Sequence, residues 1–158
     1  MKTAVERLVE QISRTGSFDV PCSADTAFPL FSPEGEREWI RDWNPRPVFP
    51  RTIEFRRDTV FCTGEGEQEA VWTIVAADWR SHRAEYVRVA TASHAARIRV
   101  QVEAVTPETS RVDVSYSITV FGSDAEDLVE AFSERAYAEK MSNWQRQISE
   151  SLQARKNC

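Results

Sequence analysis

Residues 31–45 of the chain read FSPEGEREWIRDWNP, and this stretch is more informative about the fold than any other. Ser32 and Pro33 predict the start of a helix, because a serine side chain can cap the first turn and proline is tolerated at the first helical position. We expect this helix to run to about Asp42, where the nearby Pro45 ends it. The stretch therefore predicts a short helix that carries two tryptophans.

A shorter helix is expected just before it, over residues 25–31, with Ser23 as its N-terminal cap. Residues 11–20 read as the first strand, and Gly16 is a candidate for a bulge in that strand. Two short helices would thus lie back to back between the first and the second strand.

Most of the chain between the second helix and residue 121 has the pattern of β-strands. The clearest strand is 111–120, where Val112, Val114, Tyr116, Ile118 and Val120 alternate with polar residues. Such alternation is typical of an antiparallel sheet with one buried and one solvated face. We expect six strands in this part of the chain, over residues 51–57, 59–63, 69–77, 83–91, 97–104 and 111–120.

A long helix is expected at the C-terminus. Ser123 and Glu126 match a capping box, and an apolar stripe continues from Leu128 to Leu152. At 1.5 Å per residue a helix ending near Arg155 would be about 45 Å long. Because a ten-residue strand spans only about 33 Å, one end of the helix is expected to protrude, and an exposed part of the stripe would suit a homodimer.

The composition predicts a single soluble domain over residues 1–158, with a core of about 11–155. The net charge of -5 and the scattered basic residues argue against a nucleic-acid partner. No apolar run approaches the roughly 20 residues of a membrane span, so we expect a cytoplasmic protein. Cys22, Cys62 and Cys158 lack the spacing of a metal or redox motif, and we expect neither a metal nor a cofactor.

The residues from Phe28 to Pro45, together with the order strand, two helices, six strands and long helix, resemble the helix-grip fold of the START-like (SRPBCC) superfamily. This superfamily includes birch-pollen-allergen-like proteins and aromatic polyketide cyclases. The local motif is similar to a bacterial branch of mostly unassigned function. The resemblance implies an α+β fold in which a curved seven-stranded antiparallel sheet and the last helix enclose an apolar cavity.

If the cavity is present, its walls should come from the aromatic and long apolar side chains of these elements. Trp39 and Trp43 are four residues apart and would share one helical face, so both would either pack in the core or form a cavity wall. Tyr116 lies on the apolar face of its strand, and its hydroxyl would need a partner or a ligand. The residues expected to contact a ligand are Trp39, Trp43, Phe61, Trp72, Tyr86, Tyr116, Phe132, Tyr137 and Met141.

Catalytic residues are harder to identify. Tyr86 and Arg88 would form a polar pair for an acidic or carbonyl ligand if their strand face is concave, but Val87 and Val89 favour the opposite face as the buried one. The only two histidines, His82 and His94, fall near turns and are expected at the surface.

Charged residues of the second helix allow two interpretations. Glu34, Glu36, Glu38, Arg37 and Arg41 could form the polar mouth of a cavity. Alternatively they form a solvated helix face with ion pairs three residues apart.

Three functions fit these expectations. The first is binding of an apolar or aromatic small molecule, lipid-like or polyketide-like. The second is a cyclase, dehydratase or hydrolase acting on such a molecule, which requires ionisable side chains that face the cavity. The third, implied by the resemblance, is a protein-binding role like that of the chaperone activators of this fold, which requires an exposed apolar patch.

Overall fold

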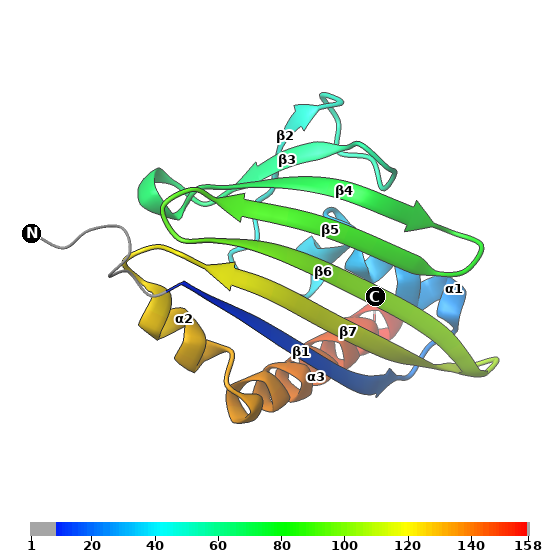
Figure 1. Ribbon diagram of the computed structural model, residues 1–158. Coiled ribbons are helices and arrows are strands. Elements are labelled where there is room, and N and C mark those ends of the chain that lie inside the picture. The colour runs from blue at the N-terminus through cyan, green and yellow to red at the C-terminus, as the bar shows by residue number, and fades with distance from the viewer. Residues whose placement is uncertain (1–8, 158) are drawn as a thin grey trace, which may run out of the picture.

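The computed structural model describes residues 9–157, and residues 1–8 and Cys158 lie outside this range. Seven antiparallel strands form one curved sheet, and the helices lie on one side of it (Figure 1). The strands are β1 (Glu10–Val20), β2 (Arg46–Phe49), β3 (Val60–Thr63), β4 (Ala70–Asp78), β5 (Arg83–Ala90), β6 (His94–Thr106) and β7 (Thr109–Val120). The helices are α1 (Ala24–Ala27), α2 (Ala125–Ala131), α3 (Glu134–Lys156) and the short 3₁₀ turns η2 (Phe28–Phe31), η3 (Gly35–Glu38) and η4 (Gly66–Gln68).

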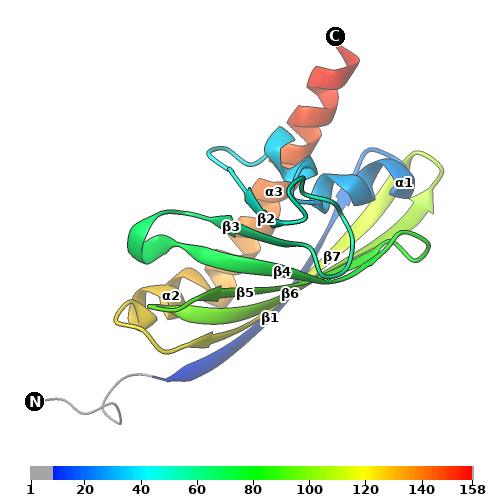
Figure 2. The same cartoon turned by 90° about the horizontal axis from the view of Figure 1, so that it is seen from above.

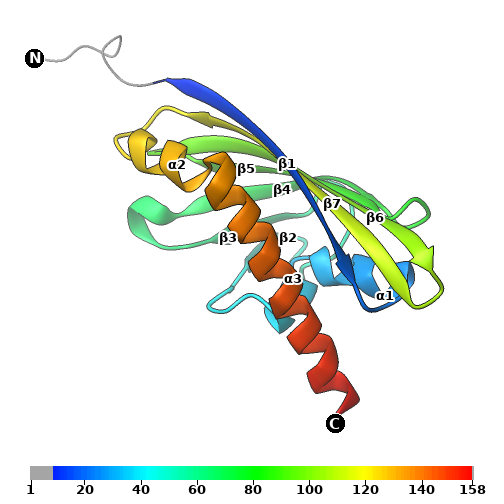
Figure 3. The same ribbon diagram turned by 90° about the horizontal axis from the view of Figure 1, so that it is seen from below.

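The sheet has the strand order β1-β7-β6-β5-β4-β3-β2, so β1 and β2 are its edges. The expected alternation is confirmed on β7, where every second residue from Val112 to Val120 is buried. These side chains and their neighbours on β6 face α3, which crosses the sheet diagonally (Figure 3). The C-terminal end of α3 projects beyond the sheet, as its length predicted (Figure 2). The α+β helix-grip architecture is therefore confirmed.

The segment after η2 differs from the expected helix. Only Gly35–Glu38 forms a 3₁₀ turn, Trp39 leaves the helical region with φ -133°, and Asp42 has a left-handed φ of 62°. Trp39 and Trp43 therefore do not share a helical face. The segment bends because Gly35 lies against η2, where a Cβ atom would be 1.9 Å from the Pro29 carbonyl oxygen.

The predicted strand over residues 51–57 is wrong. The second strand is instead Arg46–Phe49, which pairs with β3. Residues 51–57 leave the sheet because their apolar side chains cover the core elsewhere: Ile53 is buried, and Phe55 packs against Phe28 with ring centroids 5.0 Å apart.

The C-terminal helix is two helices rather than one. The chain leaves helical geometry at Phe132, whose side chain is buried against Tyr116 and whose carbonyl accepts a hydrogen bond from Arg14 Nε at 2.7 Å. Ser133 then caps α3, accepting from the Ala136 amide at 3.2 Å, whereas the expected cap at Ser123 is not formed.

Gly16 is not a bulge, because β1 and β7 pair without a shift of register. Its absent side chain makes room for α3 instead: a Cβ atom would lie 2.7 Å from Met141 Cγ and 3.0 Å from Tyr137. The glycine thus allows α3 to lie close to the edge strand, which is the side of the sheet that α3 contacts most.

Candidate functional site: an aromatic cavity with two charged residues

A cavity of about 190 Å³ lies between the sheet, the η3 segment and α3. Six aromatic side chains and three aliphatic ones make up most of its lining, and two charged residues complete it. The aromatic residues are Trp43, Phe61, Trp72, Tyr86, Tyr116 and Trp144, the aliphatic ones are Ile40, Ile98 and Val100, and the charged ones are Glu36 and Arg88.

Three direct cross-strand neighbours form one wall of this cavity. Phe61 on β3, Trp72 on β4 and Arg88 on β5 occupy matching register positions. The rings of Phe61 and Trp72 are stacked at 5.5 Å with an interplanar angle of 13°, and the guanidinium carbon of Arg88 lies 4.9 Å from the Trp72 ring centroid. A cation over an indole face is an attractive arrangement, so the contacts among Phe61, Trp72 and Arg88 hold these three side chains in place.

Trp43 closes this wall from the η3 side, edge-on to Trp72 at 5.6 Å. The indole N–H groups are already used, since Trp43 donates to the Pro33 carbonyl at 2.8 Å and Trp72 donates to Thr63 Oγ1 at 2.9 Å. These tryptophans therefore present apolar surface, and not hydrogen-bond donors, to the cavity.

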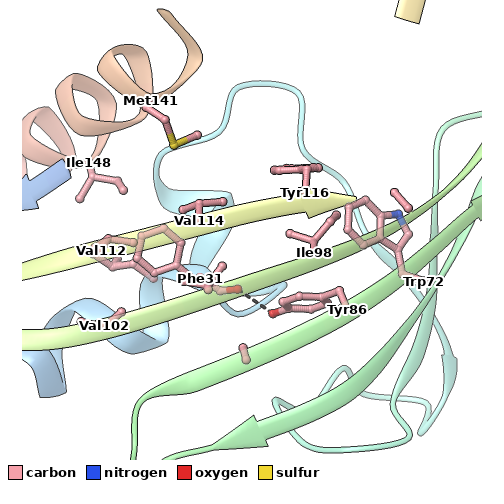
Figure 4. Packing of buried hydrophobic residues seen from close by; sticks show 14 of the residues in the cluster. Phe31, Trp72, Tyr86, Ile98, Val102, Val112, Val114, Tyr116, Met141 and Ile148 are labelled. Carbon is pink, nitrogen blue, oxygen red and sulfur yellow. Dashed lines mark hydrogen bonds between the residues drawn. The ribbon is translucent and has the colours of Figure 1, made fainter. Parts of the chain in front are cut away.

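Tyr86 and Arg88 face the cavity, so the preference for the convex face drawn from Val87 and Val89 is wrong. Figure 4 shows Tyr86 on the same side of the sheet as Trp72, Ile98 and Tyr116. The Tyr86 hydroxyl donates to the Phe31 carbonyl at 2.6 Å. Burial, and to a lesser extent Glu36, raises the pKa of this phenol well above its ordinary value.

A chain of hydrogen bonds holds Arg88 in place. Arg88 Nε donates to His94 Nε2 at 3.1 Å, so this ring nitrogen must be the acceptor of a neutral imidazole. The remaining imidazole proton is then on Nδ1, 2.7 Å from Ser93 Oγ, whose hydroxyl donates to Asp124 at 2.6 Å. Burial and the Arg88 charge lower the pKa of His94, which favours the same neutral form.

The histidines are therefore not simple surface residues. His94 is half-buried and hydrogen-bonded to Arg88, and His82 is half-buried, 2.8 Å from Asp25 and packed against Phe28. His82 lies outside the cavity lining, and His94 contributes to it through Arg88.

Glu36 enters the cavity from the η3 segment. Ser32 fixes the turn before it by accepting from the Gly35 amide at 2.9 Å and donating to the Pro29 carbonyl at 2.6 Å. Burial raises the pKa of the Glu36 carboxyl well above its ordinary value, although the Arg88 charge opposes this shift. No described carboxylate, that of Glu36 included, lies within 4.0 Å of the Arg88 guanidinium.

Tyr116 lies between the cavity and a second aromatic cluster. Its ring packs on Phe132 at 5.4 Å and on Tyr137 at 5.9 Å, and burial raises the pKa of its phenol to about 12. Lys140 Nζ lies 4.4 Å from the Phe132 ring centroid, and desolvation lowers the pKa of this amine to about 8, with Arg88 adding to the shift.

Five of the nine residues expected to contact a ligand line the cavity: Trp43, Phe61, Trp72, Tyr86 and Tyr116. The structure places the other four outside the lining. Trp39 is buried against Phe31 and Trp144 and donates to the Leu30 carbonyl. Phe132 and Tyr137 lie behind Tyr116, and Met141 packs on Gly16.

Glu36 and Arg88 were not among those nine residues. Glu36 was considered only as one of five charged residues of a possible polar cavity mouth, and the contact of Gly35 with Pro29 that distinguishes its turn from a regular helix is a tertiary one. Arg88 could have been assigned to the cavity face from strand pairing, because it lies opposite Ala96 on the face of β6 that also carries Ile98.

Several surface grooves accompany the cavity, and the two largest of them contain residues of the predicted site. One, of about 390 Å³, shares Ile40 and Trp144 with the cavity lining and also contains Arg41, Glu139 and Lys140, which indicates a mouth between η3 and α3. The other, of about 730 Å³, runs between β1 and α3 and is lined mainly by polar and charged side chains, together with Tyr137 and Met141. Of these three spaces, the inner cavity is the one with a mainly aromatic and aliphatic lining.

Within residues 9–157, no three side chains of His, Cys, Asp or Glu are grouped in a way that could hold a metal ion. In the same range, none of the helices has both the length and the apolar character needed to cross a bilayer.

No protein-family model matches the chain, and no curated protein matches it. Solved structures do. Norcoclaurine synthase from Thalictrum flavum, in complex with dopamine and hydroxybenzaldehyde, is 11% identical with a TM-score of 0.59, covering 93% of this chain and 90% of its own. An uncharacterised Rhizobium leguminosarum protein is 13% identical with a TM-score of 0.66 (91% and 98% covered). Ara h 8.0201 is 14% identical with a TM-score of 0.64 (91% and 99% covered).

Proposed function

We propose that the protein binds a small aromatic molecule in the cavity between the sheet, η3 and α3. This proposal rests on the lining of the cavity, in which six of eleven side chains are aromatic. The indole N–H groups of Trp43 and Trp72 already donate hydrogen bonds within the protein, so both rings offer a ligand apolar surface. A dry apolar cavity of about 150 Å³ can hold benzene, so 190 Å³ suits one substituted ring. The complex of norcoclaurine synthase with two single-ring aromatics supports the proposal by analogy of fold.

The size of the ligand sets the expected affinity. Burying about 150 Å² of apolar surface stabilises a complex by about 4 kcal/mol at 25 cal/mol/Å². A free energy of about 4 kcal/mol corresponds to a dissociation constant of about 1 mM, and lost translational and rotational freedom offsets part of this gain. Dissociation constants in the millimolar range are therefore expected for an uncharged ring, and titrations need ligand concentrations in that range.

The test is a calorimetric and fluorescence titration with a panel of single-ring aromatics. Saturable heat together with a change in tryptophan emission is expected. Trp72→Phe should reduce the emission change, to which Trp43 and Trp144 in the same lining also contribute. The control Trp79→Phe should retain the full change, because Trp79 is exposed and lies outside the cavity lining. Absence of saturable binding for the whole panel would overturn the proposal.

A second candidate, proton-transfer catalysis on an aromatic carbonyl compound, is favoured by the presence of Glu36 among the aromatic side chains. A carboxyl with a raised pKa can act as a general acid or base near neutral pH. Arg88 lines the same cavity and would stabilise an enolate oxygen. This arrangement suits a step of the cyclase or dehydratase type.

This candidate predicts that the protein exchanges the methyl protons of acetophenone with D₂O faster than buffer does, as followed by NMR. The Glu36→Gln variant should exchange at the buffer rate, and Glu38→Gln should retain the rate of the unmodified protein, because Glu38 lies outside the cavity lining and pairs with Arg155. Exchange at the buffer rate in the unmodified protein would leave binding as the only function supported by the site.

A further inference from the structure

Arg88 carries a positive charge inside an aromatic cavity. The guanidinium has no anionic partner among residues 9–157. Of its guanidinium nitrogens only Nε donates a hydrogen bond to a described residue, and the acceptor is the neutral imidazole of His94. The arginines of the outer sheet face differ, since Arg97 and Arg99 both pair with Glu85 at 2.6 and 2.7 Å. A buried charge is costly unless it is paired, so the cavity is incomplete without an anion.

The guanidinium is also held in a fixed orientation. Trp72 packs against it at 4.9 Å, and Nε is held by the chain of His94, Ser93 and Asp124. Neither Nη group donates a hydrogen bond to any of residues 9–157, so both can donate to a ligand. A fixed planar fork of N–H donors matches the two oxygens of a carboxylate.

Glu36 does not supply the missing anion. Its carboxylate is not within 4.0 Å of the guanidinium, and burial favours its uncharged form. An uncharged carboxyl can donate or accept a second hydrogen bond from the same ligand. One unpaired guanidinium beside such a carboxyl suits a monovalent carboxylate better than a divalent phosphate.

Building on the proposed function, we infer that the ligand is a single-ring aromatic carboxylate whose charged group pairs with the Nη groups of Arg88. Its ring then lies against the apolar side chains of the cavity, Trp43, Ile98 and Tyr116 among them. At the mouth, Arg41 and Lys140 outnumber Glu139, so the approach is also favourable for an anion.

The test compares benzoate with benzamide, which has nearly the same shape and no charge, by calorimetry at pH 6.5. Benzoate should bind at least ten times more tightly than benzamide. Arg88→Met should abolish this preference, because the affinity for benzoate should fall much further than the affinity for benzamide. Arg99→Met, whose side chain lies on the outer face and is 56% exposed, should retain the preference.

The outcomes separate this inference from the proposed function. Equal binding of benzoate and benzamide by the unmodified protein would overturn the carboxylate inference and leave aromatic binding intact. Failure of both to bind, along with the rest of the panel, would overturn the proposed function. If Arg88→Met does not fold, Arg88→Lys keeps the charge without the planar fork and should retain only part of the preference; full retention would contradict recognition by the fork.

His94 is a positioning residue in this scheme, because it acts through Arg88. His94→Leu should lower the ratio of benzoate to benzamide affinity several-fold, and His94→Gln, whose side-chain oxygen can accept from Nε, should restore it. A purely structural role would weaken both ligands equally and leave the ratio unchanged, which would contradict the assignment.

Discussion

Glu36 and Arg88 reach one cavity from opposite walls, the first from η3 and the second from β5, without forming an ion pair. Both keep part of their surface accessible although they lie in the interior, because that part faces the cavity. The pair therefore offers a ligand two different polar contacts, a fixed cation and a carboxyl that burial keeps protonated above its usual pH range.

This pair predicts a pH dependence of benzoate binding. As pH rises through the raised pKa of Glu36, its carboxyl becomes charged, repels benzoate and competes for Arg88. Benzoate affinity should therefore fall on the alkaline side, while benzamide affinity changes little. In Glu36→Gln the part of the fall due to this carboxyl should be absent, as measured by calorimetry between pH 5.5 and 9.

Other titrating groups near Arg88 must be separated from Glu36. Tyr86 and Tyr116 stay protonated in this range, and the lowered pKa of His94, caused by burial and by the Arg88 charge, favours its neutral form. Lys140, with a pKa of about 8, loses its charge in the same range and acts in the same direction. Lys140→Met should thus reduce the fall only above pH 7, and a fall that survives unchanged in Glu36→Gln would contradict the role of Glu36.

The two cavity tyrosines should differ in their effect on stability. Tyr86→Phe leaves the Phe31 carbonyl without its 2.6 Å hydrogen bond and should cost about 1 kcal/mol of unfolding free energy. The Tyr116 hydroxyl forms no hydrogen bond with residues 9–157, so Tyr116→Phe should be nearly neutral. Urea unfolding of the two variants measures this difference, and an equal loss in both would contradict it.

At this scale the sequence predicted the types of residue in the cavity better than their orientation. Val87 and Val89 made the wrong face of β5 look buried, because both are half-buried on the outer face of a central strand. Pairing β5 with β6 through the short connection between Ala90 and His94 would have corrected this, since it sets Tyr86 opposite Ile98.

The secondary-structure elements show why a helix was predicted where a 3₁₀ turn forms. Ser32, Pro33 and Glu34 carry the local signals of a helix start, and Ser32 does bond the Gly35 amide. The backbone then departs from a helix, because Gly35 packs tightly against Pro29 and Asp42 adopts a left-handed conformation. A helical sequence pattern reveals neither feature. The irregular segment brings Glu36 into the cavity and Trp39 into the core, so tertiary contacts override local propensity here.

The break between α2 and α3 leads to a matched pair of substitutions. Ser133→Ala removes the side chain that accepts from the Ala136 amide and should destabilise the protein by about 1 kcal/mol. Ser123→Ala, at the helix start that the sequence favoured, should have little effect because Ser123 caps no helix in the structure. The midpoints of urea unfolding compare the stability of the two variants. A larger loss of stability for Ser123→Ala would contradict the cap at Ser133 and favour the cap at Ser123.

For the whole molecule, the central strands and most of the last helix could be predicted from periodic patterns such as the alternation along β7, whereas the edge strand β2 and the break between α2 and α3 could not. The cavity does not follow from periodicity. It depends on tertiary contacts: Gly16 lets α3 lie close to β1, and Trp43 after η3 packs edge-on against Phe61 and Trp72 of the sheet. The aromatic content thus predicted that some aromatic side chains line a cavity. Only the three-dimensional arrangement shows which of them line it and which are buried in the core.

The central claim, that this cavity is the ligand site, is tested most directly by the indole N–H signals of the five tryptophans in a ¹⁵N NMR titration with benzoate. Trp43 and Trp72 lie in the cavity wall, and Trp79 lies outside it. Saturable shifts of the Trp43 and Trp72 signals with one common dissociation constant are expected, together with an unchanged Trp79 signal. Signals of Trp43 and Trp72 that stay fixed up to millimolar benzoate and benzamide, or a shift confined to Trp79, would contradict the central claim.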